Sequence, residues 1–421
     1  MTTASDPVVW HPFTQHGVHG PFPVVARARG AWLEIDDGRR VLDAISSWWV
    51  ITHGHCHPRI IAAIQRQAEQ LDQVMFADLT HAAAEDVARR LIALAPPGLA
   101  HAFFSDSGST AVEVALKMAL GFWRNRGEPR SRILALEHGY HGDTVGAMSV
   151  GARGLFTAAY EPLLFEVCRI PFPARDREQS ALDALEAECG RGGVAALIVE
   201  PLILGAGGML IYRPQVLAEM KRICERYQVL LIADEVMPGW GRSGTLFACE
   251  QAGIAPDIMC VAKGLTGGAL SLAVTLCRPE IFAAHVSTDR TRTLFHSSSF
   301  TANPLACAAA VANLEIWRDE PVAARIAALA AGQERQLARL VDHARVADVR
   351  QLGTIAAFDV RAPDRGYLAG IGPRLQAEML RHGVLLRPLG GTIYVMPPYC
   401  VAAAELEHIY DIIEQALTRL S

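Results

Sequence analysis

The sequence predicts an α/β protein whose main sheet is mostly parallel. Short apolar runs alternate along the chain with longer segments of helical periodicity, which is typical of proteins built from repeated strand and helix units. In addition, three apolar runs have the length and composition of buried strands. These runs are 194–199 (VAALIV), 229–233 (VLLIA) and 257–262 (DIMCVA).

The helical segments suggest how the chain divides. Residues 214–227, between the first two strand runs, have an amphipathic pattern and open with Pro214, a favoured residue in the first helical turn. Residues 321–344 are rich in Ala, Leu, Gln and Arg and predict a long helix. We therefore expect helices flanking the sheet of a large domain and a smaller α+β domain built from both termini. The expected parts are 1–54 (small domain), 55–320 (large domain) and 321–421 (small domain).

Composition and charge exclude several classes of protein. The 421 residues are 51% hydrophobic and 20% charged with a formal net charge of -5, and no basic block is present, so no nucleic-acid partner is expected. The nine cysteines are scattered singly without a C-x-x-C pair, which argues against a disulfide framework. The N-terminus lacks the pattern of a signal peptide and no apolar run is long enough to cross a bilayer. We expect a cytoplasmic protein with no membrane partner.

Each of the three strand runs ends in a residue capable of chemistry. The runs are followed by Glu200, Asp234-Glu235 and Lys263. Ligands of open α/β sheets bind at the carboxyl ends of the strands, so the three runs predict a site at one edge. Strand ends also carry charges because they meet solvent, and for each residue taken singly that alternative stays open.

A fourth segment, residues 103–120 (FFSDSGSTAVEVALKMAL), reads as a strand end, a turn of small residues at 105–109 and a helix. Thr110 and Glu113 have the spacing of a capping box, so we expect the helix to begin there. Backbone N–H groups at such a helix start suit a phosphate. The turn has neither the dinucleotide nor the Walker pattern, so a phosphate monoester fits better. An ordinary helix cap is the alternative.

A phosphate cradle, a lysine and an aspartate are together what pyridoxal 5′-phosphate (PLP) requires. Lys263 would form a Schiff base with the aldehyde, and Asp234 would keep the pyridine nitrogen protonated because a nearby carboxylate favours the charged form. The pyridinium then draws in the electrons released when a substrate loses its α-proton. The sequence therefore predicts a PLP enzyme.

The chain resembles the class III aminotransferases of PLP fold type I. The central pattern of that class is similar to LIADEVMPGWGRSG (231–244), followed by the lysine of AKGLTGG (262–268). The resemblance runs from WHPF at residue 10 to MPPY at residue 396. Within the class the chain looks like the branch that aminates 8-amino-7-oxononanoate in biotin synthesis. That likeness rests on SSWW (46–49), DSGSTAVEVALKMAL (106–120), GYHGDT (139–144), MSV (148–150), EPLILGAGGM (200–209) and NPLACAAA (303–310).

The resemblance implies roles for individual residues. The implied catalytic residues are Lys263, Asp234 and Tyr140, with Tyr140 stacked on one face of the cofactor ring and Val236 packed on the other. The other implied cofactor-binding residues are Gly108, Ser109 and Glu200. The resemblance also implies a homodimer with a shared active site, in which Ser298 and Ser299 bind the cofactor across the interface.

The implied substrate pocket contains Phe13, Trp48, Trp49 and Tyr394, and Arg387 would receive the distal carboxylate of the substrate. A guanidinium binds a carboxylate in bidentate fashion, although Arg387 taken alone could be a surface residue. The tryptophan pair taken alone could be core packing. Because adjacent residues of an extended chain point to opposite sides, we expect only one of the two tryptophans to face the ligand.

Departures from the family pattern bear on the amino donor. Relatives mostly take nitrogen from S-adenosylmethionine and a minority take it from lysine, and the former usually have tyrosine where this chain has Phe13. Ser297–Ser299 replace the usual Gly-Pro-Thr or Gly-His-Thr, and Pro238 and Trp240 replace Thr and Phe. We expect S-adenosylmethionine as the donor. The alternatives are a lysine-using version of the same enzyme and a broad amine or ω-amino-acid transaminase.

Further alternatives concern the reaction and a metal. An aminomutase, a decarboxylase or a non-catalytic regulator uses the same scaffold, but a regulator normally carries an additional DNA-binding domain. The implied transfer proceeds in two half-reactions with ping-pong kinetics, in which the Lys263 amine moves the α-proton.

His53, His55 and His57 imitate a metal site. The family has a loop of the form HGxxHP here without a metal, so none is expected.

Overall fold

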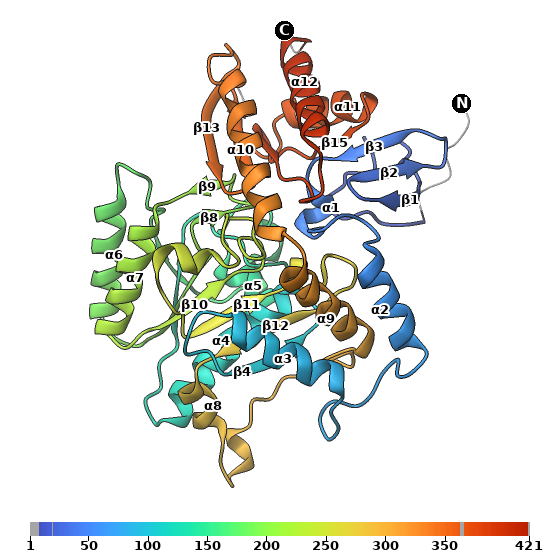
Figure 1. Cartoon of the computed structure of the whole chain (residues 1–421). Helices are drawn as coiled ribbons and strands as arrows, with labels where there is room; N and C mark the ends of the chain where they lie inside the picture. Colours follow the sequence, from blue (N-terminus) through green and yellow to red (C-terminus); the bar gives the residue numbers. More distant parts are fainter. Residues whose placement is uncertain (1–7, 19, 363–365, 420–421) are drawn as a thin grey trace.

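A computed structural model describes residues 8–18, 20–362 and 366–419 of the chain. Its centre is a seven-stranded sheet with the order β4-β12-β11-β10-β7-β5-β6 (Figure 1). Strand β12 is antiparallel to both of its neighbours, and the other adjacent pairs are parallel, which confirms the mostly parallel sheet. The strands are β4 (His101–Ser105), β5 (Arg132–Leu136), β6 (Cys168–Ile170), β7 (Val194–Val199), β10 (Leu230–Asp234), β11 (Ile258–Val261) and β12 (Ala273–Cys277).

The predicted strands and the helix between them are all present. The three apolar runs form β7, β10 and β11, and residues 214–227 contain helix α7 (Pro214–Arg226) with Pro214 in its first turn. Alternate side chains of β7 enter different cores. Ala196 and Ile198 pack with the helix α4 side of the sheet, and Leu197 and Val199 pack with the side of α6 and α7. Burial of both faces explains why these strands are apolar throughout.

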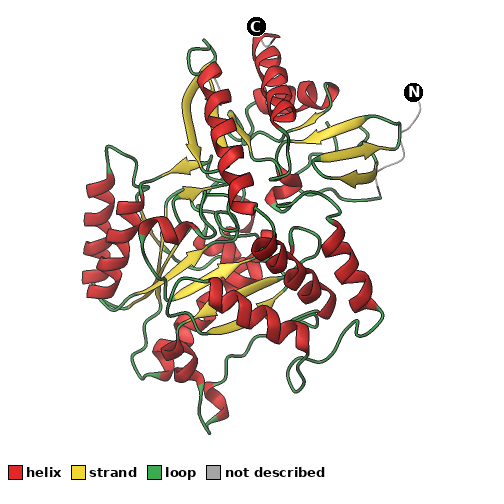
Figure 2. Cartoon of the chain, in the orientation of Figure 1, coloured by secondary structure: helices red, strands yellow, loops and turns green. Residues whose placement is uncertain are grey.

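Helices cover both faces of the sheet, as the view by secondary structure shows (Figure 2). Helices α3 and α9 pack with β4, β11 and β12 in a further core that contains Phe104, Met259 and Leu276. The helices of this part are α2 (Pro58–Ala68), α3 (Ala82–Leu94), α4 (Gly108–Asn125), α5 (Val145–Val150), α6 (Glu178–Gly190), α7, α8 (Pro279–His285) and α9 (Pro304–Asp319). A short hairpin of β8 (Ile203–Leu204) and β9 (Leu210–Ile211) follows β7.

Segments from both ends of the chain form one lobe beside the large sheet (Figure 1). Strand β3 pairs in parallel with β15, so the two terminal regions share a sheet. The predicted long helix is α10, which ends four residues before residue 344. The division at residues 54/55 and 320/321 stays a prediction, and residues 1–7 lie outside the described part. The elements of this lobe are β1 (Val25–Arg29), β2 (Trp32–Ile35), β3 (Arg40–Asp43), α1 (Ser46–Trp49), α10 (Val322–Leu340), β13 (Val346–Leu352), β14 (Ile355–Val360), α11 (Ile371–Arg381), β15 (Val384–Leu385), β16 (Thr392–Val395) and α12 (Ala403–Arg419).

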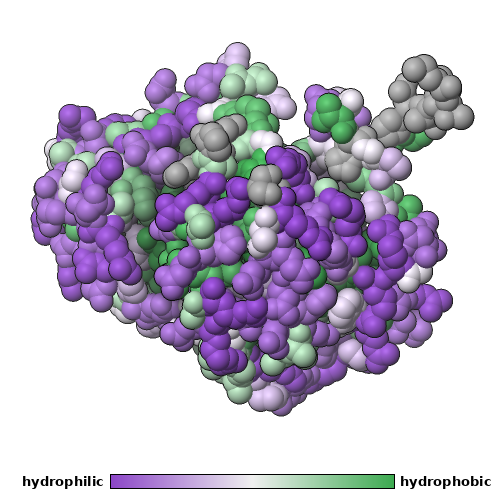
Figure 3. Space-filling view, turned by 90° about the horizontal axis from the view of Figure 1, so that it is seen from above, coloured by the Kyte–Doolittle hydropathy of each residue, from purple (hydrophilic) through white to green (hydrophobic). Residues whose placement is uncertain are grey.

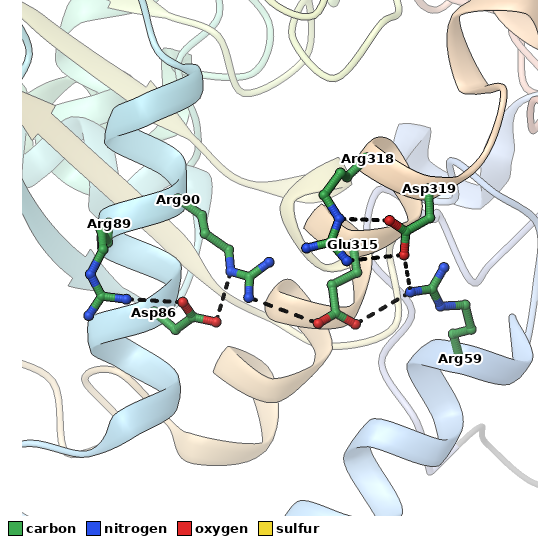
Figure 4. A network of polar contacts seen from close by, with 7 residues as sticks. All are labelled: Arg59, Asp86, Arg89, Arg90, Glu315, Arg318 and Asp319. Atoms are coloured by element: carbon green, nitrogen blue, oxygen red, sulfur yellow. Dashed lines mark hydrogen bonds and ion pairs between the residues drawn. The ribbon is translucent and has the colours of Figure 1, made fainter.

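A chain of ion pairs links α3, α9 and α2 on the surface (Figure 4). Arg59 of α2 reaches Asp319 at 2.8 Å, and Arg90 of α3 reaches Asp86 at 2.8 Å and Glu315 of α9 at 4.0 Å. These groups are partly exposed, so each pair contributes about 0–1 kcal/mol. They join α2, which follows α1 in the chain, to two of the helices that cover the large sheet.

The outer surface is predominantly hydrophilic in the view from above, with hydrophobic residues showing between the polar ones (Figure 3). Within residues 8–18, 20–362 and 366–419, none of the helices combines the length and the apolar character needed to cross a membrane.

Candidate active site at the carboxyl edge of the large sheet

A cavity of about 430 Å³ lies at the carboxyl edge of the seven-stranded sheet. The loops that follow β4, β5, β7, β10 and β11 all contribute to its wall, and so do the residues just before the antiparallel β12. The strand ends predicted from sequence therefore meet at one place. The sequence-predicted residues that line the cavity are Phe13, Trp48, Trp49, Gly108, Ser109, Tyr140, Glu200, Asp234, Val236, Lys263, Arg387 and Tyr394.

The chain contains three lysines, and only one of them lines this cavity. Lys117 is exposed on α4, where its Nζ lies 3.2 Å from Nδ1 of His296. Lys221 is buried and pairs with Asp257 at 2.8 Å, before the start of β11. Lys263 follows the other end of that strand. The structure thus leaves Lys263 as the amine available at the site.

The Lys263 amine lies in an environment that disfavours its charge. Burial lowers its pKa to about 8, although the negative charges of Asp234 and Glu200 raise it in part. Its Nζ lies 4.7 Å from the centroid of the Trp49 ring. About a tenth of the amine is therefore neutral at pH 7, far more than for an ordinary lysine, and a neutral amine is the form that reacts with an aldehyde or accepts a proton.

The residues that hold the turn of Lys263 in place were not predicted from the sequence. The residue begins a short 3-10 helix (Lys263–Thr266) with a φ of 48°, in the left-handed region that is unfavourable for a side chain with a Cβ. Asn313, fully buried on α9, donates from Nδ2 to the carbonyls of Gly264 and Leu265 at 3.0 Å each. Its Oδ1 lies 2.9 Å from Nε2 of His53. This buried pair fixes the turn that carries the lysine.

Asp234 has a buried partner that sequence reasoning also missed. Nδ1 of His141 lies 2.7 Å from Oδ2 of Asp234, and Oδ1 of Asp234 accepts a hydrogen bond from the Val236 N–H at 3.1 Å. Both side chains are almost fully buried. The histidine stands within GYHGDT, but its only sequence signal was the family resemblance of that motif.

Glu200 is buried at the end of β7 and both of its oxygens are engaged. They accept hydrogen bonds from the backbone N–H groups of Tyr140 and Gly205, each at 2.9 Å. Burial raises the pKa of Glu200 to about 7, and the nearby His141 and these hydrogen bonds oppose that rise. Burial also raises the pKa of Tyr140. Glu200 therefore positions the loop that carries Tyr140.

The helix after the small-residue turn begins earlier than predicted. The capping box is formed by Ser107 and Thr110, so α4 begins at Gly108, and the predicted Thr110–Glu113 box is wrong. Glu113 instead accepts a hydrogen bond from the Gly146 N–H at 2.6 Å, which competes with local capping. The earlier start presents the N-terminus of an 18-residue helix to the cavity.

Two glycines keep the space at this helix start open. A Cβ on Gly108 would lie 2.6 Å from Cγ1 of Val236. Gly142 has a φ of 123°, and a Cβ there would lie 2.0 Å from Oγ of Ser109. Free N–H groups, a hydroxyl and room for close approach fit a phosphate group.

Ser298 and Ser299 do not line the cavity of this single chain. Oγ of Ser298 donates to Oδ2 of Asp106 at 3.1 Å, and the Ser299 carbonyl accepts from Nε2 of Gln73. A contact of these serines with the phosphate of a second copy stays a prediction.

Both tryptophans line the cavity, so the expectation that only one would do so is wrong. Residues 46–49 are not extended: Ser47 and Trp49 have φ values of 58° and 66°. This twist turns both rings to the same side. Trp49 is buried and its Nε1 donates to the Tyr394 hydroxyl at 2.9 Å, whereas Trp48 is 45% exposed at the mouth.

Arg387 lies at the mouth of the cavity. Its Nη2 donates to the Phe13 carbonyl at 3.2 Å, and its Cζ lies 5.2 Å from the centroid of the Trp48 ring. The Phe13 ring packs against Trp48 and edge-on against Phe156. Phe156 and Tyr367 also line the cavity and were not predicted, because both lie in loops without periodicity.

The alternating histidines have partners other than a metal. His53 contacts Asn313, His55 contacts Asp43 at 2.9 Å, and His57 lies 3.6 Å from Glu320. Among the described residues, no group of three or more His, Cys, Asp or Glu side chains is arranged to hold a metal ion.

Comparison with known proteins adds to this geometry. The family model for aminotransferase class III matches residues 13–417. The chain belongs to the class III aminotransferases. It is therefore a PLP-dependent transaminase of fold type I, and its Lys263, Asp234 and helix-start turn have the chemistry that this cofactor needs.

Curated relatives match over nearly the full length of the chain. An adenosylmethionine-8-amino-7-oxononanoate aminotransferase of Synechococcus elongatus is 46% identical, with 99% of this chain and 100% of the relative covered. A protein of the same name from Mycobacterium leprae is 41% identical, with 95% of this chain and 93% of the relative covered.

Solved structures of two kinds share the fold equally well. An adenosylmethionine-8-amino-7-oxononanoate aminotransferase from Methanocaldococcus jannaschii has a TM-score of 0.93 at 32% identity, with 98% of this chain and 97% of that chain covered. An amine transaminase from an uncultivated Pseudomonas species has a TM-score of 0.93 at 33% identity, with coverage of 99% and 100%. The fold alone therefore does not distinguish these two substrate classes.

Proposed function

We propose that this aminotransferase transfers an amino group from S-adenosylmethionine to 8-amino-7-oxononanoate and so forms 7,8-diaminononanoate for biotin synthesis. The observation that carries the proposal is the position of Arg387 at the mouth of a cavity walled by Trp48, Trp49 and Tyr394. A long apolar chain that ends in a carboxylate needs an apolar wall and a guanidinium at its end. The names of the full-length relatives agree with this substrate.

Lys263 would hold the cofactor and move the proton. Its Nζ is the lysine nitrogen at the cavity, and its pKa of about 8 leaves part of the amine neutral at neutral pH. When bound, PLP supplies an electron sink for the α-carbon of the substrate. The Lys263 amine would remove the α-proton as general base and would then, as general acid, return it to the carbon of the cofactor's aldehyde group.

The remaining cofactor-binding residues divide by the part of PLP that they would contact. Asp234, oriented by His141, would pair with the pyridine nitrogen, and Tyr140 and Val236 would cover the two faces of the ring. Gly108 and Ser109 would bind the phosphate at the N-terminus of α4. Glu200 would act through Tyr140, because its two oxygens are occupied by backbone N–H groups.

We further propose a cytoplasmic homodimer in which Ser298 and Ser299 of a second copy complete the phosphate site. Within each copy we propose a large PLP-binding domain at 55–320 and a small domain formed by 1–54 and 321–421. The pairing of β3 with β15 supports the joining of the two terminal parts.

A broad amine transaminase is the second candidate, and the likeness to the Pseudomonas amine transaminase favours it. The two candidates differ at Arg387, because a simple amine or ketone has no carboxylate for this residue to bind. A lysine-using enzyme differs from the first candidate only in its donor.

A donor screen tests the proposal. 8-Amino-7-oxononanoate is the acceptor in an assay coupled to detection of 7,8-diaminononanoate, and S-adenosylmethionine, lysine and simple amines are compared as donors. We expect product with S-adenosylmethionine. Transfer from simple amines to simple ketones, without product from 8-amino-7-oxononanoate, would favour the second candidate.

A further inference from the structure

The turn that carries the two tryptophans has a backbone conformation that its own residues disfavour. Ser46, Ser47 and Trp49 have φ values of 55°, 58° and 66°, so three of the four residues of α1 lie in the left-handed region. A residue with a Cβ is unfavourable there, and it persists only where surrounding contacts hold it. The twist is nevertheless what brings both tryptophan rings to the cavity. Contacts from outside the turn must therefore maintain it.

Asp43 supplies such contacts. It is the last residue of β3, and its side chain is fully buried. Its Oδ1 accepts a hydrogen bond from the Ile45 N–H at 3.2 Å. Its Oδ2 accepts from the Ser47 N–H at 2.7 Å and from the Ser47 hydroxyl at 3.2 Å. Since β3 lies between β2 and β15 in the small sheet, this carboxylate ties the turn to a paired strand.

His55 supplies a fourth donor to the same carboxylate. Its Nε2 lies 2.9 Å from Oδ2 of Asp43, and its side chain is mostly buried. A carboxylate oxygen only accepts, so the Nε2–H of His55 donates. The backbone of His55 is itself fixed, because it exchanges hydrogen bonds with Gly30 at 2.7 and 3.2 Å. Four donors thus share two oxygens, whereas an amide side chain would offer one acceptor oxygen only.

The rings carried by the turn contact Lys263 and Arg387. Nζ of Lys263 lies 4.7 Å from the centroid of the Trp49 ring, and Cζ of Arg387 lies 5.2 Å from the centroid of the Trp48 ring. The Trp49 ring also packs so closely on Gly205 that a Cβ there would lie 3.2 Å from it. A change in the turn would therefore move both rings relative to the two charged side chains.

We propose that Asp43 and His55 are positioning residues, which hold Trp48 and Trp49 in the orientation that the long-chain acceptor requires. The inference rests on the proposed function for the identity of that acceptor. Neither Asp43 nor His55 lines the cavity, so both act through the turn and not on the substrate. The shape of the apolar wall is then set by a hydrogen-bonded pair behind it.

Fluorine NMR tests the positions of the rings without turnover. The full chain, loaded with PLP, is labelled with 5-fluorotryptophan at its seven tryptophans, and Trp48→Phe and Trp49→Phe assign two of the resonances. In Asp43→Asn these two resonances should shift or broaden more than the others, because an amide leaves at least one N–H without an acceptor. Unchanged Trp48 and Trp49 resonances in a folded Asp43→Asn protein would overturn the proposal.

Acceptor kinetics test whether the ring positions matter to the reaction. Asp43→Asn should lower kcat/KM for 8-amino-7-oxononanoate at least about tenfold through a higher KM, and should change PLP affinity less than about twofold. Adding Trp48→Ala to Asp43→Asn should cost less than the product of the two single losses, since both changes affect the same contact. Losses that simply multiply would mean that Asp43 does not act through the tryptophans, and they would overturn the proposal.

Two variants of His55 keep the test decisive if Asp43→Asn does not fold. His55→Gln retains an N–H donor toward Asp43 and should keep kcat/KM within about threefold of the unmodified enzyme. His55→Leu has no donor, so it should lower kcat/KM several-fold and shift the same two resonances. Equal behaviour of the two variants would overturn the proposal.

Asp257→Asn is the matched control. Asp257 is another buried carboxylate that accepts a backbone N–H, from Leu231 at 2.8 Å, and it lies outside the cavity. This variant should lose stability in thermal melting without moving the Trp48 and Trp49 resonances. Unmodified enzyme that makes no 7,8-diaminononanoate overturns the proposed function, whereas the resonances still test the positioning. Normal product formation with unmoved resonances in both Asp43→Asn and His55→Leu overturns the positioning alone.

Discussion

Nδ1 of His141 lies 2.7 Å from Oδ2 of Asp234, at the end of β10 and almost fully buried. The other carboxylate oxygen accepts the backbone N–H of Val236. Asp234 is therefore held from two sides and cannot rotate freely. A carboxylate fixed in this way keeps a constant distance from whatever nitrogen it contacts in the cavity.

Asp234→Asn should retain cofactor binding and lose most activity. A neutral amide cannot favour a protonated pyridine nitrogen, so we expect turnover to fall by at least about 100-fold. Steady-state assays of the loaded enzyme measure this loss, and cofactor content is measured by absorbance. Asp257→Asn, which changes a buried carboxylate outside the cavity, controls for the loss of a buried charge. Near-normal turnover of Asp234→Asn would show that another residue pairs with the nitrogen.

Borohydride reduction should attach the cofactor to Lys263. The protein as purified should be yellow, and peptide mapping after reduction should find the label on one of only three lysines. We expect none on Lys117, which is exposed, or on Lys221, which is paired with Asp257. Label on either of these, or a colourless protein that cannot bind added PLP, would exclude the assignment of Lys263.

The cofactor-free protein should show the depressed pKa of Lys263 directly. Acetylation by a trace of labelled anhydride follows the neutral amine, so its rate at Lys263 should rise with pH and level off with a midpoint of about 8. Asp234→Asn should shift this midpoint down, because the negative charge of Asp234 raises the pKa. Mass spectrometry of the Lys263 peptide measures both. A midpoint near the ordinary value of about 10.4 would mean that the amine is not desolvated.

The same shift predicts how the charge of Lys263 affects folding. The unfolded chain binds this proton up to about pH 10.4, whereas the folded chain releases it near pH 8. Between these values the unfolded state holds more protons, so the contribution of Lys263 to stability rises with pH. Lys263→Met should remove this rise in the cofactor-free protein, as measured by denaturant unfolding at pH 7 and pH 9.

The strands and the edge where they meet could be predicted, because burial on both faces leaves a continuous apolar run. Strand β7 begins and ends at the predicted residues, and Glu200, Asp234 and Lys263 follow their strands into one cavity. The start of α4 could not be predicted, because the Glu113 carboxylate accepts a hydrogen bond from the Gly146 N–H of α5 and does not cap its own helix. The sharing of the cavity by both tryptophans depends on the backbone twist at Ser47 and Trp49, which periodicity does not indicate.

The residues that support the site could not be predicted from the sequence for a related reason. Asn313 reaches Gly264 from a helix far along the chain, and His141 reaches Asp234 across the sheet. Phe156 and Tyr367 meet from separate loops. These contacts form only when segments far apart in the sequence pack together, so local sequence patterns do not indicate them.

Arg387→Ala should impair the acceptor much more than the cofactor. Losing a charge-assisted contact to the distal carboxylate costs about 2–3 kcal/mol, or roughly 30- to 150-fold in acceptor efficiency. Acceptor kinetics and a PLP titration measure the two effects. Arg374→Ala, on the exposed side of α11, is the control. An unchanged acceptor constant in Arg387→Ala would remove Arg387 from the substrate site.

Phe13→Tyr should improve the use of S-adenosylmethionine by no more than a few-fold. The Phe13 ring packs against Trp48 and Phe156 with centroid distances of 5.9 and 5.7 Å, and its carbonyl accepts from Arg387. Tyrosine can retain all three contacts and adds one hydroxyl, whose hydrogen bond contributes about 0.5–1.5 kcal/mol. That gain is too small to exchange a large sulfonium donor for a small diamine.

Donor half-reactions with S-adenosylmethionine and with lysine measure this preference in the unmodified enzyme and in Phe13→Tyr. Phe165→Tyr, which adds the same hydroxyl outside the active-site cavity, is the control. We expect S-adenosylmethionine to be the better donor in all three proteins, because Trp48, Trp49 and Tyr140 are unchanged in each. If lysine supports turnover and S-adenosylmethionine gives none, the residue at position 13 outweighs the rest of the pocket, and the proposed donor is wrong.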